Sequence, residues 1–384
     1  MTASSARGPD LAPGTLPWYV WTTVLAASST VIGVIWDISW HRTIGRDTFW
    51  TPAHIAIYLG GVLAGVTGGV VVLRTTFGPA TARGPSVRFW GFQAPLGVWL
   101  CIWGAFAMVT SAPFDNWWHN AYGLDVKVLS PPHVLLALGM WGIQFGALLL
   151  VLAQQNRATD PRTRRWSAWG VALLAGIILE NGAILGIEQV GFANAARTAV
   201  YYQFAAACFP VVLLAAGRAG ALRWSATATA AAYMAISLGM IWILELFPAT
   251  PKLAPVFNPV THMVPAPFPL LLVVPALALD RLLPAFGRGR DGALAVAAGL
   301  AFLAIFLVVQ WFAADFLLSA HARNVVFGVD HWDYSSRLGP WRYQFWRTDT
   351  NPVTPAALGA AALLAVCSSR IGLWWGSWMS RVKR

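Results

Sequence analysis

Long apolar runs alternate with short polar segments along the whole chain. About ten of these runs reach some 20 residues, the length that a helix needs to cross the hydrocarbon core of a bilayer. Transmembrane strands would show shorter segments of alternating polarity. The pattern predicts an all-α, polytopic transmembrane helix bundle with spans at residues 16–36, 53–73, 88–110, 132–153, 166–189, 197–217, 223–246, 262–282, 293–318 and 354–377.

The composition agrees with a membrane protein. Of the 384 residues, 57% are hydrophobic and only 11% are charged, whereas soluble domains carry about 25% charged residues. The three cysteines lie inside apolar runs without a CxxC pair, which excludes a secreted domain held by disulfides. No convincing cleavage site follows the first apolar run, so we expect it to be retained and residues 1–15 to be a disordered lead.

The net charge of +11 reflects topology. Most of the 26 Lys and Arg residues lie at the two termini and in alternate connections, and the positive-inside rule makes those segments cytoplasmic. We therefore expect a protein of the cell membrane with both termini on its cytoplasmic side. No basic and aromatic nucleic-acid motif accompanies the charge, so the lipid bilayer, and not nucleic acid, is the predicted partner of these cations.

With this orientation, all seven histidines fall at the extracytoplasmic face. Asp37 and His41 have i, i+4 spacing, which places both on one face of a helix, one turn apart. His54 follows Thr51-Pro52, a hydroxyl and a proline that together favour a helix start. A helical hairpin would thus bring an Asp and two His together at its outer end.

A second segment repeats this arrangement. Asp115 and His119 have the same spacing, and His133 follows Ser130-Pro131 in the same way. Asp-His-His is a donor set that suits copper, zinc or iron, and three protein ligands leave a fourth position open. A structural Asp–His hydrogen bond at each helix end is the alternative, but the repetition favours two metal sites.

One motif resembles a known family. The run D-x-S-W-H-x-T-x-x-R-D-T-x-x-T-P-x-H-I, from Asp37 to Ile55, is similar to the C subunit of copper membrane monooxygenases, the particulate methane and ammonia monooxygenases. The resemblance covers about residues 20–155 and implies that Asp37, His41 and His54 form a catalytic copper site. The second group resembles that subunit's other copper site, where an Asn is the first ligand; here Asp115 takes that place, with Asn116 beside it.

The remaining residues, about 160–384, have a weaker likeness to the A subunit of the same enzymes. We therefore expect a fused chain, with a C-like bundle at 16–155, a cytoplasmic linker at 156–165 and an A-like bundle at 166–384. The resemblance implies one or two copper ions, O2 and a small apolar substrate such as a short hydrocarbon or ammonia. It also implies a separate cupredoxin-like B-type subunit and a homotrimer.

Two other classes remain as alternatives. A non-enzymatic copper-binding or copper-transport protein is the first, although soft Met- or Cys-rich ligands do not line a path across the membrane. A zinc-dependent membrane hydrolase is disfavoured because no HExxH motif occurs.

Further polar residues are candidates for function. Arg46, Asp47 and Asn116 are candidates for orienting the metal ligands. Glu180, in the middle of a span, is either functional or a protonated group bonded to a neighbouring helix. Glu245 and His262 flank one outer loop and either face the metal region or mark the interface. His331 lies in an aromatic outer loop that fits an interface belt, a lid or a subunit contact. Four residues are thus candidates for other functions: Glu180, Glu245, His262 and His331.

Overall fold

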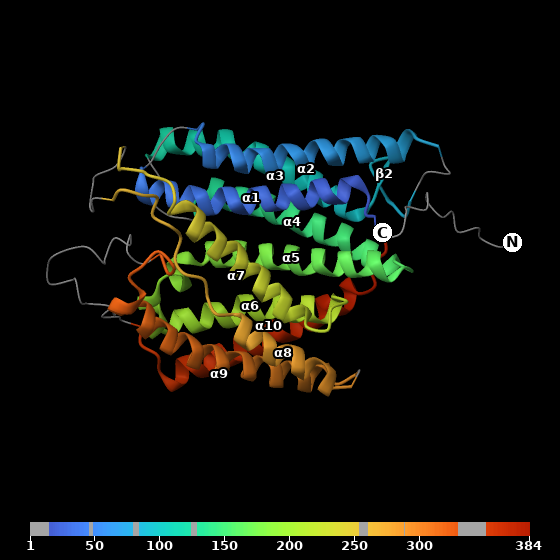
Figure 1. Cartoon of the computed structure of the whole chain (residues 1–384). Coiled ribbons are helices and arrows are strands. Elements are labelled where there is room, and N and C mark those ends of the chain that lie inside the picture. Colours follow the sequence, from blue (N-terminus) through green and yellow to red (C-terminus); the bar gives the residue numbers. More distant parts are fainter. Residues whose placement is uncertain are drawn as a thin grey trace.

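The protein is a bundle of long helices (Figure 1). The computed structural model describes residues 15–45, 49–79, 84–123, 129–252, 260–287, 289–328 and 351–384. Its elements are α1 (Trp18–Thr43), α2 (Pro52–Phe77), β1 (Val87–Phe89), β2 (Phe92–Ala94), α3 (Leu96–Tyr122), α4 (Pro131–Arg157), α5 (Pro161–Leu185), the π-helix η2 (Ile187–Gly191), the 3-10 helix η3 (Ala193–Arg197), α6 (Ala199–Ala219), α7 (Ser225–Leu244), α8 (Val273–Ala285), α9 (Asp291–Leu317), η4 (Ala320–Ala322) and α10 (Pro355–Met379).

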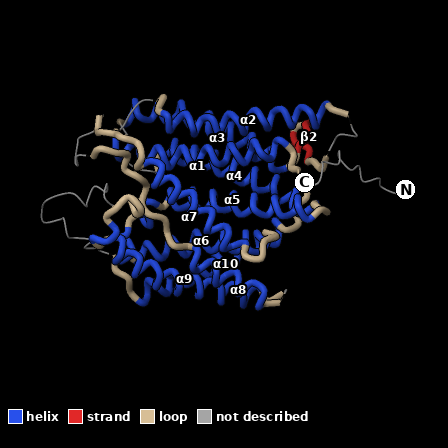
Figure 2. Tube along the Cα trace, viewed as in Figure 1, coloured by secondary structure: helices blue, strands red, loops and turns tan. Residues whose placement is uncertain are grey.

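Nine helices within the described residues are long and apolar enough to cross a membrane, namely all of the α-helices except α8. They stack side by side, with α1–α4 on one side of α5 and α6–α10 on the other (Figure 1). Loops gather at the two ends of the bundle (Figure 2). Helix α1 begins and α10 ends at the same end, so the ends of the described chain share one side. The all-α polytopic prediction is confirmed at this level; which membrane face each end occupies stays a prediction.

The span predicted at 262–282 is wrong in its first half. Helix α8 begins only at Val273, and residues 263–271 form a segment without regular secondary structure. Prolines at 265, 267 and 269 explain the difference, because each removes a backbone donor and clashes with a preceding turn. The hydropathy of this segment is that of a spanning helix, but its prolines prevent one.

Side chains of α1 and α7 form hydrogen bonds with the backbone of this irregular segment. Ser39 Oγ donates to the carbonyl of Val264 at 2.6 Å, and Thr43 Oγ1 accepts from Val264 N–H at 2.7 Å. Further along, Tyr233 Oη accepts from Leu270 N–H at 2.9 Å. Val264 is 1% exposed, so these bonds replace those that water would supply.

Two predicted spans also differ at their ends. The first residues of the span predicted at 88–110 form the antiparallel hairpin β1–β2, with Trp90 and Gly91 both at positive φ in its two-residue turn. Helix α3 then begins at Leu96 and continues to Tyr122, while α1 continues to Thr43. These longer helices include the Asp and first His of each metal-ligand group.

The connection between α4 and α5 is shorter than the predicted linker at 156–165. Helix α4 extends to Arg157 and α5 begins at Pro161. Asp160 is the N-cap of α5, and its carboxylate accepts from the N–H groups of Arg162 and Thr163. The cap and the proline that follows it start the helix within the predicted linker.

Helices α3 and α4 make a close contact through glycines. A Cβ atom added at Gly104 would lie 2.5 Å from the carbonyl oxygen of Gly139 and 2.7 Å from Ile143 N. Helices α1 and α2 approach similarly, since a Cβ at Gly33 would lie 2.8 Å from Ile57 N. Small residues let the backbones of membrane helices touch. Close contacts of this kind stabilise both helix pairs that bear an Asp and two His, α1 with α2 and α3 with α4.

We predict that Gly104→Ala destabilises the protein. Alanine favours a helix over glycine by about 1 kcal/mol, but the added methyl group must push α3 and α4 apart, and overpacking costs about 1–3 kcal/mol. Gly69→Ala is the matched control, because a Cβ at Gly69 has no neighbour within 4 Å. Thermal unfolding in detergent should give a lower Tm for Gly104→Ala than for Gly69→Ala; the reverse order would contradict the proposed contact.

Candidate metal centres

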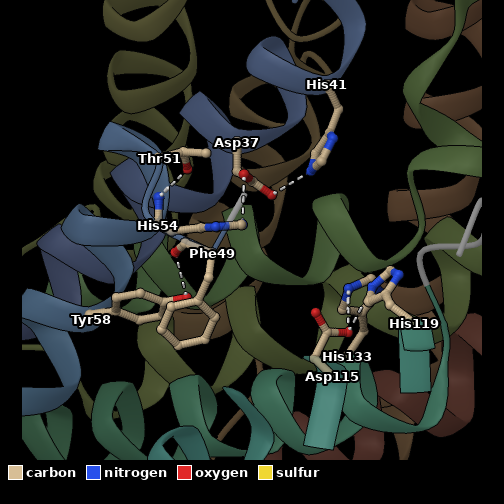
Figure 3. A network of polar contacts seen from close by, with 9 residues as sticks. All are labelled: Asp37, His41, Phe49, Thr51, His54, Tyr58, Asp115, His119 and His133. Carbon is tan, nitrogen blue, oxygen red and sulfur yellow. Dashed lines mark hydrogen bonds and ion pairs between the residues drawn. The ribbon is translucent and has the colours of Figure 1, made fainter. Parts of the chain in front are cut away.

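The first Asp-His-His group lies where α1 ends and α2 begins (Figure 3). Asp37 and His41 stand one turn apart at the end of α1, and His54 is in the first turn of α2. His41 Nε2 lies 3.5 Å from Asp37 Oδ2, and His54 Nε2 lies 3.2 Å from Asp37 Oδ1. The Asp carboxylate therefore lies between the two imidazoles, with one oxygen toward each.

The second group has a similar arrangement at the end of α3 and the start of α4, but here one carboxylate oxygen faces both imidazoles. Oδ1 of Asp115 lies 3.3 Å from His119 Nε2 and 3.5 Å from His133 Nε2. Figure 3 shows both groups in one view. Both lie at the end of the bundle opposite to the start of α1, since α1 and α3 run toward the same end (Figure 1).

Helix caps position the third ligand of each group. Thr51 Oγ1 accepts a hydrogen bond from His54 N–H at 3.0 Å, and Ser130 Oγ accepts one from His133 N–H at 3.4 Å. In both helices a proline follows the cap, and the histidine is the third helical residue. The cap fixes where the helix begins, and so it fixes the direction in which the histidine projects.

The donor atoms have the spacing that a metal ion requires. In each group one nitrogen or oxygen per residue lies within 4.8 Å of the other two. Around a tetrahedral ion with bonds of about 2.0–2.1 Å, neighbouring donors lie roughly 3.3–3.4 Å apart, close to the Asp–His distances of 3.2–3.5 Å. An Oδ1 atom of each Asp is also shielded from solvent. The residues therefore fit a transition-metal ion in either group.

The two groups differ in exposure. The side chain of Asp37 is 20% exposed and that of Asp115 is 34% exposed. The second histidine of each group follows the same order, with 24% for His54 and 35% for His133. The first histidines have the reverse order, with 38% for His41 and 23% for His119. The Asp and the second His are therefore more shielded in the first group, and the first His is more shielded in the second.

Tyr58 is a neighbour of the first group that the sequence analysis missed. Its ring centroid lies 6.0 Å from that of His54, one helical turn earlier, and its hydroxyl donates to the carbonyl of Phe49 at 3.1 Å. Phe49 and Trp50 pack on the same ring. The i, i+4 spacing of His54 and Tyr58 is the signal in the sequence that indicates this contact.

The predicted candidates also include Arg46, Asp47, Asn116 and His331. Of these, Arg46, Asp47 and His331 lie outside the described residues. Asn116 is exposed, and it is Asp115 that approaches the two histidines.

Glu180 is buried in α5, and Ser237 Oγ of α7 donates to its Oε2 at 2.5 Å. Beside it, Asn181 Nδ2 donates to Gln144 Oε1 of α4 at 3.4 Å. A hydrogen bond to a neighbouring helix, one of the two possibilities for Glu180, is therefore present. A role of Glu180 beyond this contact stays a prediction.

Glu245 and His262 lie at the same end of the bundle as the Asp-His-His groups. Glu245 is buried at the end of α7. His262 forms a β-bridge with Pro248 across the loop, and its Nδ1 lies 3.0 Å from Thr261 Oγ1. Within the described part of the chain, three ligand-type side chains converge only in the two Asp-His-His groups, so neither residue is part of such a group.

Comparison with known proteins adds no relative: no protein-family model matches the chain, and neither a curated protein nor a solved structure matches it. What the site can do must therefore be argued from its own residues.

We predict that the full chain binds two equivalents of a divalent transition metal, one in each group. His54→Ala and His133→Ala should each reduce this to one equivalent, and the double variant should bind none, because two remaining ligands hold an ion poorly. His321→Ala is the control, since this exposed histidine lies outside both groups. Elemental analysis after desalting measures the result; unchanged stoichiometry in both single variants would contradict metal binding there.

The cap generates a separate prediction. Thr51→Ala removes the hydroxyl that accepts from His54 N–H and should cost about 0.5–2 kcal/mol of stability. It should also weaken metal binding to the first group, because His54 loses its fixed position, while the second group is unaffected. Thr51→Ser keeps the hydroxyl and should bind like the wild type in a competition titration with a chromogenic chelator. Equal affinity of Thr51→Ala and Thr51→Ser would refute a positioning role.

Proposed function

We propose that this multi-pass membrane protein is a copper-dependent monooxygenase, or a subunit of one, that hydroxylates a small apolar substrate with O2. One observation carries the proposal: two Asp-His-His groups of similar arrangement lie at one end of the bundle. The donor geometry supports a bound transition metal. Copper, and the monooxygenase reaction, are inferred from the resemblance of the Asp37–Ile55 motif to the copper membrane monooxygenases.

Each residue of the first group has a role in this proposal. Asp37 supplies a negative charge that offsets part of the charge of the ion, and its two oxygens hold the imidazoles of His41 and His54 apart. His54 is fixed by its helix cap. His41, with 38% of its side chain exposed, marks the open side from which O2 and substrate would approach.

A copper ion held by these residues would supply the reductive activation of O2 for attack on a C–H or N–H bond of the substrate. The protein would supply three ligands and leave a coordination position free. Apolar substrates and O2 dissolve in hydrocarbon, and both groups lie at helix ends beside exposed aromatic side chains such as Trp50 and Trp117. Aromatic residues of this kind concentrate where a bilayer meets water, so substrate would reach the site from the lipid.

The proposal includes further partners. A separate cupredoxin-like B-type subunit and assembly into a homotrimer follow from the resemblance alone. We place both groups at the extracytoplasmic face of the cell membrane because the Arg-rich connections lie at the other end of the bundle.

A non-enzymatic copper-binding or copper-handling protein is the alternative. The exposure of the ligands in both groups, between 20% and 38%, favours it, because exposed ligands exchange ions readily with solution. Transport across the membrane is less well supported, since both groups of ligands lie at one end of the bundle.

We predict that membranes containing the chain oxidise a short hydrocarbon or ammonia when supplied with copper, O2 and a reductant, with one atom of labelled O2 entering the product. Asp37→Asn and His54→Ala should abolish turnover, and His321→Ala should retain it. Paramagnetic resonance of the purified protein should show Cu(II) with nitrogen ligands, and His54→Ala should lose that signal. Copper binding without turnover would favour the alternative; stoichiometric zinc in place of copper would refute both.

A further inference from the structure

A cavity of about 390 Å³ opens at the end of the bundle opposite to the metal groups. It lies between the α4–α5 connection and the α6–α7 connection. Pro161, Arg164, Arg165 and Ala168 line it from α5, and Ala221 and Leu222 close it from the other connection. The spacing i, i+3, i+4, i+7 puts the four α5 residues on one face of that helix.

Two arginines and one aspartate line the cavity, which leaves it with a net positive charge. Arg164 and Arg165 are both exposed, and no acidic side chain in the described part of the chain forms an ion pair with either. Asp160 also lines the cavity, but its carboxylate accepts from the N–H groups of the first turn of α5. Two guanidinium groups thus point to an anionic ligand, and their planar donors match a phosphate.

The surroundings of the cavity indicate a lipid as the source of that phosphate. Trp166 and Trp169 of α5 are about half exposed, and Trp169 lies one helical turn beyond Arg165, toward the middle of the bundle. Arginine at the membrane surface with tryptophan one turn deeper is the arrangement expected at a lipid headgroup and the upper part of its acyl chain. Basic pockets between membrane helices bind anionic headgroups in this manner.

We propose that this cavity binds the phosphate of an anionic phospholipid, held by Arg164 and Arg165 with its acyl chains beside the exposed rings of Trp166 and Trp169. The bound lipid joins two connections that are distant in sequence, α4–α5 and α6–α7. Because it binds the folded protein only, it raises the stability of the bundle by linkage. The site is independent of the metal groups and of the reaction proposed for them.

The test compares the full chain with variants of neighbouring arginines. Arg164→Gln/Arg165→Gln removes both guanidinium groups that line the cavity. Arg162→Gln/Arg223→Gln is the matched control, because it removes the same charge from exposed residues near the cavity that do not line it. Native mass spectrometry and thermal unfolding are measured with phosphatidylglycerol and with phosphatidylcholine added to the detergent micelles.

The wild type and the control should retain phosphatidylglycerol over phosphatidylcholine and unfold at a higher temperature when it is present. Arg164→Gln/Arg165→Gln should bind it at least about tenfold more weakly, because the phosphate loses its charge-assisted hydrogen bonds to both guanidinium groups. Ala221→Trp, which fills the cavity and keeps both arginines, should have the same effect. If the unfolding temperature of a variant drops without lipid, its lipid-dependent shift still reports binding.

Three results would overturn the proposal. An equal loss of binding in Arg162→Gln/Arg223→Gln would mean that the lipid is attracted by surface charge alone. Unchanged binding in Ala221→Trp would mean that the cavity is not the site. An equal shift with inorganic phosphate at the same phosphate concentration would mean that a free phosphate, and not a lipid, is the ligand.

Discussion

Inside hydrocarbon, every backbone N–H and C=O must find its partner within the protein. The long helices meet this condition by themselves, but the segment at 263–271, which has no regular secondary structure, does not. It depends on hydroxyl groups of α1 and α7, in particular Ser39, Thr43 and Tyr233. An unpaired polar group at this depth costs several kcal/mol. The position of these three hydroxyls therefore constrains how the second half of the chain can pack on the first.

This constraint reaches the first metal group through α1. Ser39 and Thr43 follow Asp37 and His41 by two residues, which is about 200° around a helix, so the two pairs lie on opposite faces. One face contacts the segment at 263–271, and the other bears Asp37 and His41. Arg42 also donates to the carbonyl of Pro265 at 3.2 Å. The face of α1 opposite to Asp37 and His41 thus forms hydrogen bonds with residues more than 200 positions away in sequence. This agrees with the lower exposure of Asp37 than of Asp115.

The local patterns in the sequence predicted most of the helices and the convergence of both Asp-His-His groups, because hydropathy, i, i+4 spacing and helix caps act over a few residues. Helix ends were less predictable: the polar ligands at 37 and 115 were expected near or beyond the apolar spans, yet α1 and α3 continue through them. The bond between Ser39 and Val264 joins residues 225 positions apart. Nothing in either segment alone indicates it, since it depends on how two helices and a proline-rich segment pack.

The coupling between the two halves also bears on why they would be joined in one chain. The α7–α8 connection contacts the end of α1 repeatedly, with Lys252 N–H bound to the carbonyl of Ile44 at 3.0 Å in addition to the bonds at Val264. In separate subunits these contacts would form in a bimolecular association, whereas in a single chain they form at the high effective concentration that a short connection provides. Because the same turns of α1 bear Asp37 and His41, any ordering of that helix end by the second half lowers the entropic cost of assembling the first metal group. A single chain would thus keep this group preorganised without depending on subunit concentration.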